Sequence, residues 1–273
     1  IAGYLIDHGG WRMAFIIPGC FSILVGFFYM ALRWDGIHAE RNATIVPNAG
    51  NAAPPSASYR ALLLRVSIIV FFTTAVSSVI FQATTFALPK IFDERLQGLA
   101  AELSAWMENF AWAGQGDVAT VIGSLAFIVF AVASIAQLVV GSMLDRFGPR
   151  HVFMVVSTIQ LIFFMAMPGL RDGMALAVAL CFMLGAFGQI PINDYMIGKT
   201  ASGAYRARIY GVRYVVSFTA LATSLPFIAF VYQTWGFDTL FRILAGAAIV
   251  IFCAVTILPR NLPTPEAAPE AAD

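Results

Sequence analysis

The chain has 273 residues, of which 60% are hydrophobic and only 11% are charged. Soluble globular domains carry about 25% charged residues, so this composition argues against one. The net charge of +1 and the lack of a basic cluster give no reason to expect nucleic acid as a partner.

Seven stretches without a charged residue extend over about 17 to 27 positions each, at 13–32, 66–89, 118–144, 152–170, 173–193, 214–237 and 243–259. A helix needs about 20 apolar residues to cross the hydrocarbon core of a bilayer. Lipid offers no water to backbone groups, so each stretch must close its own hydrogen bonds as a helix. The sequence therefore predicts an all-α polytopic membrane protein with seven transmembrane helices.

The first predicted helix is separated from the other six by a polar segment. We expect residues 1–33 to contain the end of an N-terminal bundle and residues 34–61, with three prolines, to form a flexible cytoplasmic linker. Residues 62–260 are expected to form a six-helix bundle, and the Pro/Ala/Glu-rich tail 261–273 to be disordered. The block of six divides as three plus three, which is compatible with an inverted repeat.

The segment 90–117 between the second and third stretches contains apolar residues at helical spacing, namely Leu96, Leu99, Leu103, Trp106 and Phe110. This pattern predicts a short amphipathic helix that lies on the outer membrane face or caps the bundle. It is either a functional lid or a connector packed on the surface, and the connector is the interpretation we favour.

Positive residues indicate the orientation, because they collect in short cytoplasmic loops. The loops alternate sides, and eleven of the sixteen Lys and Arg residues fall on one side. We expect that side, and the C-terminus with it, to be cytoplasmic, in a bacterial inner or plasma membrane. The start at Ile1 and the odd number of helices suggest a fragment that lacks an N-terminal part.

One loop combines charged residues with glycines. Residues 141–150 read Gly-Ser-Met-Leu-Asp-Arg-Phe-Gly-Pro-Arg and join the third and fourth predicted helices. Gly141 permits close helix approach, and Gly148 permits a positive φ that other residues resist. Asp145 lies at the membrane edge, where it could interact with a helix N-terminus. Two arginines are also near enough to pair with it, Arg146 and Arg150.

This loop resembles the cytoplasmic signature G-x-x-x-D-R-x-G-x-R of the major facilitator superfamily. That signature lies between helices two and three and, more weakly, between helices eight and nine. One helix, a long polar linker and six helices fit the second position, so the chain would hold helices six to twelve. Residues 9–15 and 86–92 look like the family's turn before helix six and its exit from helix seven. The alternative is a positively charged turn without further meaning.

The resemblance implies secondary active transport of a small solute by alternating access, with a cavity between two six-helix halves. It also implies four partners: the solute, a coupling proton or ion, the lipid bilayer and the missing N-terminal bundle of the same protein. Pro149 stands where the family commonly has a basic residue, which leaves one fewer charge pair.

The resemblance places cavity-facing residues on helices seven, eight, ten and eleven, and polar side chains within lipid tend to face the bundle interior. In the stretch 66–89 several polar residues, Ser77 among them, share one face by three- and four-residue steps. Gln82 suits a polar substrate because it both donates and accepts, although it could instead tie helices together. The substrate-binding candidates are Gln82, Ser78, Thr74, Thr85, Gln189 and Asn193.

The stretch 173–193 ends in a segment where Pro191 removes a backbone hydrogen bond and can kink the helix. A kink there would form a hinge with a polar lining. Asp194 is interpreted as an interfacial acid that pairs with Lys199 or Arg206 rather than as a proton-coupling group. We predict that the gating group comprises Gly141, Asp145, Arg146, Gly148, Arg150, Pro191 and Asp194.

Three further polar residues are expected to have structural roles. Gln137 and Gln160 are single amides within apolar stretches and are interpreted as ties between helices. Arg213 is interpreted as a cytoplasmic anchor of the sixth predicted helix.

Other function classes lack their motifs. The chain contains no Gly-x-x-x-x-Gly-Lys-Ser/Thr loop for ATP and no HExxH or GxSxG motif. The three histidines lie far apart and the three cysteines lack metal-binding spacing, so we expect neither an enzyme nor a cofactor or metal. The remaining alternative is a non-transporting receptor or sensor on a transporter scaffold.

Overall fold

The computed structural model describes residues 12–13, 15–32, 57–108, 118–200 and 206–258, in which all regular secondary structure is helical. The chain divides into two units, Ile1–Pro54 and Pro55–Asp273. The first unit holds the helix Phe15–Leu32, which is long and apolar enough to cross a membrane. The expected tail 261–273 and most of the expected linker 34–61 lie outside the described residues.

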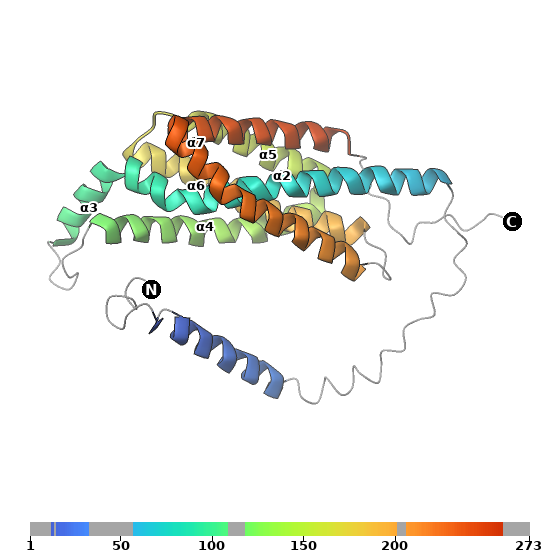
Figure 1. Ribbon diagram of the computed structural model, residues 1–273, viewed down its shortest axis with the longest axis horizontal. Coiled ribbons are helices and arrows are strands. Elements are labelled where there is room, and N and C mark those ends of the chain that lie inside the picture. Colours follow the sequence, from blue (N-terminus) through green and yellow to red (C-terminus); the bar gives the residue numbers. More distant parts are fainter. Residues whose placement is uncertain (1–11, 14, 33–56, 109–117, 201–205, 259–273) are drawn as a thin grey trace. The chain divides into compact units, whose positions relative to one another are not determined.

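Six helices make up the second unit: α2 (Ala57–Arg95), α3 (Gln97–Glu108), α4 (Val118–Phe147), α5 (Pro149–Ala166), α6 (Asp172–Thr200) and α7 (Arg206–Thr256). All but α3 run alongside one another, and α3 lies at one end of the bundle (Figure 1). Helix α2 begins at Ala57, within the expected linker 34–61. Its 39 residues span about 58 Å, well beyond the hydrocarbon core of about 30 Å.

Among the described residues, six helices are candidates for membrane spans, one in the first unit and five in the second. The last candidate, Arg208–Thr256, lies in α7 and contains a break. Gly236 in α7 has φ 77° and ψ 178°, so this element consists of two helices that meet at that residue. The uncharged stretches 214–237 and 243–259 place the boundary between the last two predicted helices at residues 238–242. The break lies instead at Gly236, because this backbone conformation is essentially restricted to glycine.

Packing in the second unit centres on α6 and α7. Helix α6 contacts α2, α4 and α5, and α7 contacts α2 and α5. Three fully buried aromatic rings from α5, α6 and α7 meet, with centroids 5.2 to 6.3 Å apart, namely Phe164, Phe182 and Phe241. Each such pair contributes about 0.5–1.5 kcal/mol beyond its buried area.

The outer surface of this bundle is apolar. Leu138 of α4 is 76% exposed, Phe127 of the same helix is 66% exposed, and Val215 of α7 is 65% exposed. Further large apolar side chains of the bundle are at least 60% exposed, among them Leu64, Ile68 and Met174. Exposure of so many large apolar side chains is unfavourable in water and favourable in hydrocarbon, in agreement with a membrane location.

A polar network fixes the end of the bundle where α2 ends. The Arg95 guanidinium donates to the Leu170 carbonyl at 3.1 Å and pairs with Asp238, which lies just after the break in α7. Asp238 also accepts from the Gly169 amide at 3.2 Å. One arginine therefore joins the end of α2 to the α5–α6 turn and to α7.

Helix α3 follows Arg95 closely in the chain. It confirms the predicted short amphipathic helix. Asp172, at the start of α6, accepts from the Leu99 amide in the first turn of α3 at 2.8 Å, where a carboxylate also complements the helix dipole. Leu96, just before α3, is fully buried, Leu103 packs against the core and Trp106 is exposed. Of the residues in the predicted pattern, Phe110 lies outside the described ones. The packing agrees with a connector on the bundle surface.

Gly236→Ala is expected to lower the free energy of unfolding by about 1–3 kcal/mol, because a Cβ strains the backbone at positive φ. Thermal unfolding of the purified protein in detergent measures this. The matched control is Gly246→Ala, where an added Cβ meets nothing within 4 Å and alanine favours the helix. Equal melting temperatures for the two variants would contradict the prediction.

Candidate functional site

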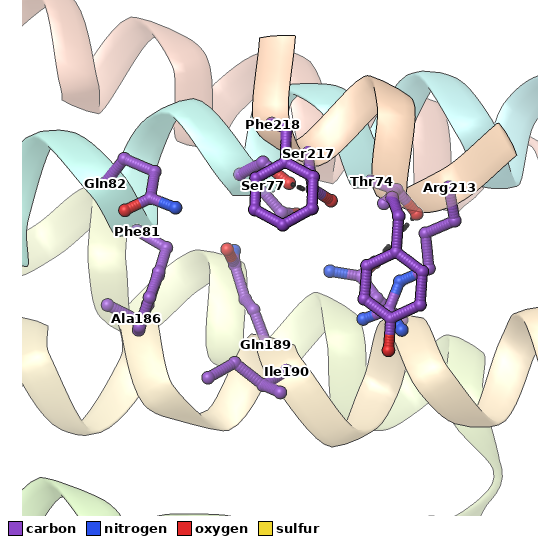
Figure 2. A pocket seen from close by; sticks show the side chains of 13 residues that line it. Thr74, Ser77, Phe81, Gln82, Ala186, Gln189, Ile190, Arg213, Ser217 and Phe218 are labelled. Carbon is purple, nitrogen blue, oxygen red and sulfur yellow. Dashed lines mark hydrogen bonds between the residues drawn. The ribbon is translucent and has the colours of Figure 1, made fainter. Parts of the chain in front are cut away.

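A cavity of about 260 Å³ opens between α2, α6 and α7. Figure 2 shows its lining, with Gln82 and Arg213 on opposite sides of Gln189 in this view. The lining residues are Thr74, Ser77, Ser78, Phe81 and Gln82 of α2, Ala186, Gln189, Ile190 and Asn193 of α6, and Arg213, Tyr214, Ser217 and Phe218 of α7. The cavity thus combines hydroxyls, amides and one cation with aromatic and aliphatic walls.

Helix α2 contributes a polar face to this cavity. Thr74, Ser78 and Gln82 follow one another at four-residue steps, which places them on one side of the helix. Ser78 exchanges a hydrogen bond with Ser217 of α7 at 3.3 Å. Ser77 is 2% exposed, and its hydroxyl has no hydrogen-bond partner among the described residues.

Helix α6 contributes two buried amides one turn apart. Asn193 accepts a hydrogen bond from the Thr74 hydroxyl at 3.4 Å. Gln189 is 1% exposed, and its Nε2 donates to Oε1 of Gln160 on α5. The prediction that Gln160 ties helices is confirmed. Gln189 Oε1 is left without a hydrogen-bond partner among the described residues, at the edge of the cavity.

Close contact between α5 and α6 positions this amide pair. A Cβ added at Gly185 would lie 2.7 Å from Cγ of Gln160, which is too close for a real contact. The small residue at Gly185 therefore lets Gln160 lie against α6 and reach Gln189. Gly188 is similarly close to Val140 of α4, where an added Cβ would lie 3.1 Å from a methyl group.

Helix α7 contributes the charge. Arg213, whose side chain is 15% exposed, forms an ion pair with Asp194 of α6. The sequence-based expectation that Asp194 pairs with Lys199 is wrong, since the Lys199 ammonium instead lies 5.3 Å from the centre of the Tyr195 ring. The side chain of the other expected partner, Arg206, lies outside the described part. Arg213, interpreted from the sequence as an anchor, lines the cavity.

The structure brings together five of the six predicted substrate-binding residues, namely Gln82, Ser78, Thr74, Gln189 and Asn193. Thr85 is not among the lining residues, although its buried hydroxyl also has no hydrogen-bond partner among the described residues. Sequence reasoning did not select Phe81, Arg213, Ser217 or Phe218. The sequence pattern that could have identified Arg213 and Ser217 is a charged residue at the edge of an apolar stretch, followed by a serine four residues later.

A comparison with known protein families matches residues 92–273 to the Major Facilitator Superfamily. This match covers well over half of the 273 residues. The chain belongs to the Major Facilitator Superfamily. A search among curated proteins finds no match. Family membership makes the chain a multi-pass membrane protein of a class that transports solutes and does not act as enzymes, and it confirms the resemblance drawn from the loop 141–150.

The signature loop of this superfamily member differs in detail from expectation. Gly148 has φ 76°, as predicted, and ends the turn before α5. The prediction of close helix approach at Gly141 is wrong for the described part of the chain, where an added Cβ would meet nothing within 4 Å.

The charges of the loop do not pair with one another in the described part of this transporter. Asp145 is exposed and forms no ion pair with either neighbouring arginine there. Arg150 instead donates to the Thr256 carbonyl at 2.8 Å, which ties the start of α5 to the end of α7. Arg146 lies 5.3 Å from the centre of the Phe147 ring.

The expected hinge at Pro191 is not a break in the transporter's helix. Helix α6 continues through Pro191 from Asp172 to Thr200.

Within the described part of the chain, no group of three or more His, Cys, Asp or Glu side chains is placed to hold a metal ion.

Gly185→Ala is expected to lower the free energy of unfolding of this transporter by about 1–3 kcal/mol, because the added methyl group overpacks the contact with Gln160. The measurement is thermal unfolding in detergent. Gly173→Ala on the same helix is the control, since an added Cβ there meets nothing within 4 Å. A Gly185→Ala protein as stable as this control would contradict the close approach of α5 and α6.

Proposed function

We propose that this chain moves a small solute across the membrane by alternating access, as part of a secondary active transporter. The observation that carries the proposal is the polar cavity between α2, α6 and α7 within a bundle whose surface is apolar. Polar side chains within lipid are costly and tend to mark a solute or ion path. A site at the interface of helices, near the middle of the membrane, is the arrangement that secondary transporters use.

The proposed topology has seven crossings. The break at Gly236 supports two crossings within α7, because residues 206–235 and 237–256 are each long enough to span the hydrocarbon core. With the helix Phe15–Leu32 and the four other long helices, the total becomes seven. The excess of Lys and Arg on one side supports a cytoplasmic C-terminus in an inner or plasma membrane.

We further propose that residues 62–260 form one of two bundles that rock against each other around the cavity. Helix α4 packs on α6, and α7 packs on α2. In an inverted repeat of three plus three helices, the symmetry that relates the two triplets maps the α4–α6 contact onto the α7–α2 contact. The presence of both contacts supports that arrangement. The partner bundle would include the helix Phe15–Leu32, and an ion or solute gradient would drive the movement.

Reconstitution of the intact protein, with both bundles, into proteoliposomes tests this function. The measurement is uptake of a panel of labelled solutes, with and without a proton or sodium gradient. We expect saturable uptake of at least one solute that a gradient drives against its concentration. Saturable binding without movement of solute would instead support the receptor or sensor alternative.

Gln82→Ala is expected to raise the apparent KM for the transported solute about 5- to 20-fold, the value of one lost hydrogen bond to a bound solute. Gln137→Ala makes the same change on α4, outside the cavity lining, and serves as the control. Uptake kinetics in proteoliposomes measure both variants. A Gln82→Ala protein with lower thermal stability but unchanged KM would make Gln82 a packing residue.

Asp145→Asn is expected to lower the maximal transport rate at least about tenfold while membrane insertion stays normal, because an exposed carboxylate in the signature loop is proposed to act during conformational exchange. Transport rate and the amount of inserted protein are measured together. Glu94→Gln, an exposed carboxylate at the other end of the bundle, is the control. Unchanged flux in Asp145→Asn would remove this residue from the gating group.

A further inference from the structure

We propose that the cavity takes a small organic anion, whose carboxylate binds Arg213 in competition with Asp194. This inference rests on the proposed function, because it takes the cavity to be the binding site of the transported solute. Of the described residues that line the cavity, Arg213 alone is charged. Asp194 pairs with it from outside the lining. The charged group that a solute meets at the cavity wall is therefore a guanidinium, which Asp194 neutralises until a solute carboxylate competes for it.

The environment of Arg213 leaves it able to bind a second carboxylate. Its side chain is 15% exposed, whereas that of Asp194 is 44% exposed, so the cation is the more deeply placed member of the pair. Nη1 faces Asp194, and the buried Nε has no hydrogen-bond partner among the described residues. A guanidinium carries five donors in a fixed plane and holds carboxylates through two parallel hydrogen bonds. Arg213 thus retains unused donor capacity at the cavity.

Two further atoms without hydrogen-bond partners indicate which functional groups the anion carries besides its carboxylate. Ser77 Oγ and Gln189 Oε1 belong to side chains that are 2% and 1% exposed, and neither has a hydrogen-bond partner among the described residues. An unpaired buried polar group is unfavourable, so a solute that pairs with these atoms gains affinity. A solute with a hydroxyl group besides its carboxylate would satisfy these atoms, and the rings of Phe81 and Phe218 would contact its apolar part.

Competition at Arg213 would also couple solute binding to the contact between α6 and α7, two of the helices that form the cavity wall. Helices α6 and α7 contact each other much less than either contacts α2. The interactions that join them at this level include the Asp194–Arg213 pair and a long hydrogen bond of 3.5 Å from the Tyr210 hydroxyl to the Asp194 carbonyl. A carboxylate that displaces Asp194 would therefore loosen the contact between α6 and α7.

The test is binding to the purified protein in detergent, by calorimetry and by the ligand-induced rise in melting temperature. The probes are lactate and benzoate, each compared with its neutral amide, lactamide and benzamide. We expect the carboxylates to bind and the amides to bind at least about tenfold more weakly, as the loss of a charge-assisted hydrogen bond requires. Dioctanoyl phosphatidylglycerol provides the comparison with a lipid headgroup.

Variants separate this role from a purely structural ion pair. Asp194→Asn removes the competitor and keeps the cation, so carboxylate affinity should rise about three- to tenfold. The double variant Asp194→Asn/Arg213→Gln leaves neither partner of this pair charged and should fold while its carboxylate affinity falls about 10- to 100-fold. Arg171→Gln, an exposed arginine away from the cavity, should bind carboxylates as the unaltered protein does.

The proposal is overturned if Asp194→Asn weakens or does not change carboxylate binding. Equal binding of the amides, or binding of phosphatidylglycerol alone, would overturn it too. Gradient-driven transport of neutral solutes with no carboxylate binding would refute this inference and leave the proposed function intact. Carboxylate binding that follows Arg213 without any flux would refute the proposed function and leave the inference intact.

Discussion

Hydrocarbon gives polar groups no hydrogen bonds, and this constraint organises the structure from the backbone to the cavity. Most described hydroxyls within the helices meet it locally. Thr84, Ser157 and Ser224 each donate to the carbonyl four residues earlier on the same helix. Such bonds satisfy the side chain and leave the helix intact.

The polar groups that do not meet this constraint are informative because they gather in one place. Buried side-chain atoms with neither a hydrogen bond nor an ion pair in the described part of the chain belong to Ser77, Thr85, Gln160, Gln189 and Arg213. Three of these residues line the cavity, and Gln160 contacts the lining residue Gln189 directly. Unsatisfied polar groups in apolar surroundings cost free energy. Their concentration at one cavity is expected where a polar solute completes the hydrogen bonds.

Two arginines show how similar ion pairs serve different purposes. Arg95 pairs with Asp238 and also donates to a backbone carbonyl, so it holds three segments at one end of the bundle. Arg213 pairs with Asp194 through one nitrogen, while its Nε stays buried without a hydrogen bond among the described residues. Both aspartates are similarly exposed, at 43% and 44%, so the two ion pairs differ in the partners of the guanidinium and not in access to water. The Arg213 guanidinium lies against the cavity with donor capacity to spare, which separates a structural charge from a candidate binding group.

The sequence by itself determined the helices, the membrane class and the family, because long uncharged stretches have one stable form in lipid and the loop 141–150 is distinctive. The spacing of Thr74, Ser78 and Gln82 also placed them on one face, since helical period is a local property. Only the tertiary structure decided that α7 opposes this face, that Asp194 meets Arg213 rather than Lys199, and that Asp145 stands apart from its arginines. The physical reason is that these pairings depend on the rotation and depth of separate helices. Those are set by contacts such as Gly185 against Gln160, between residues far apart in the chain.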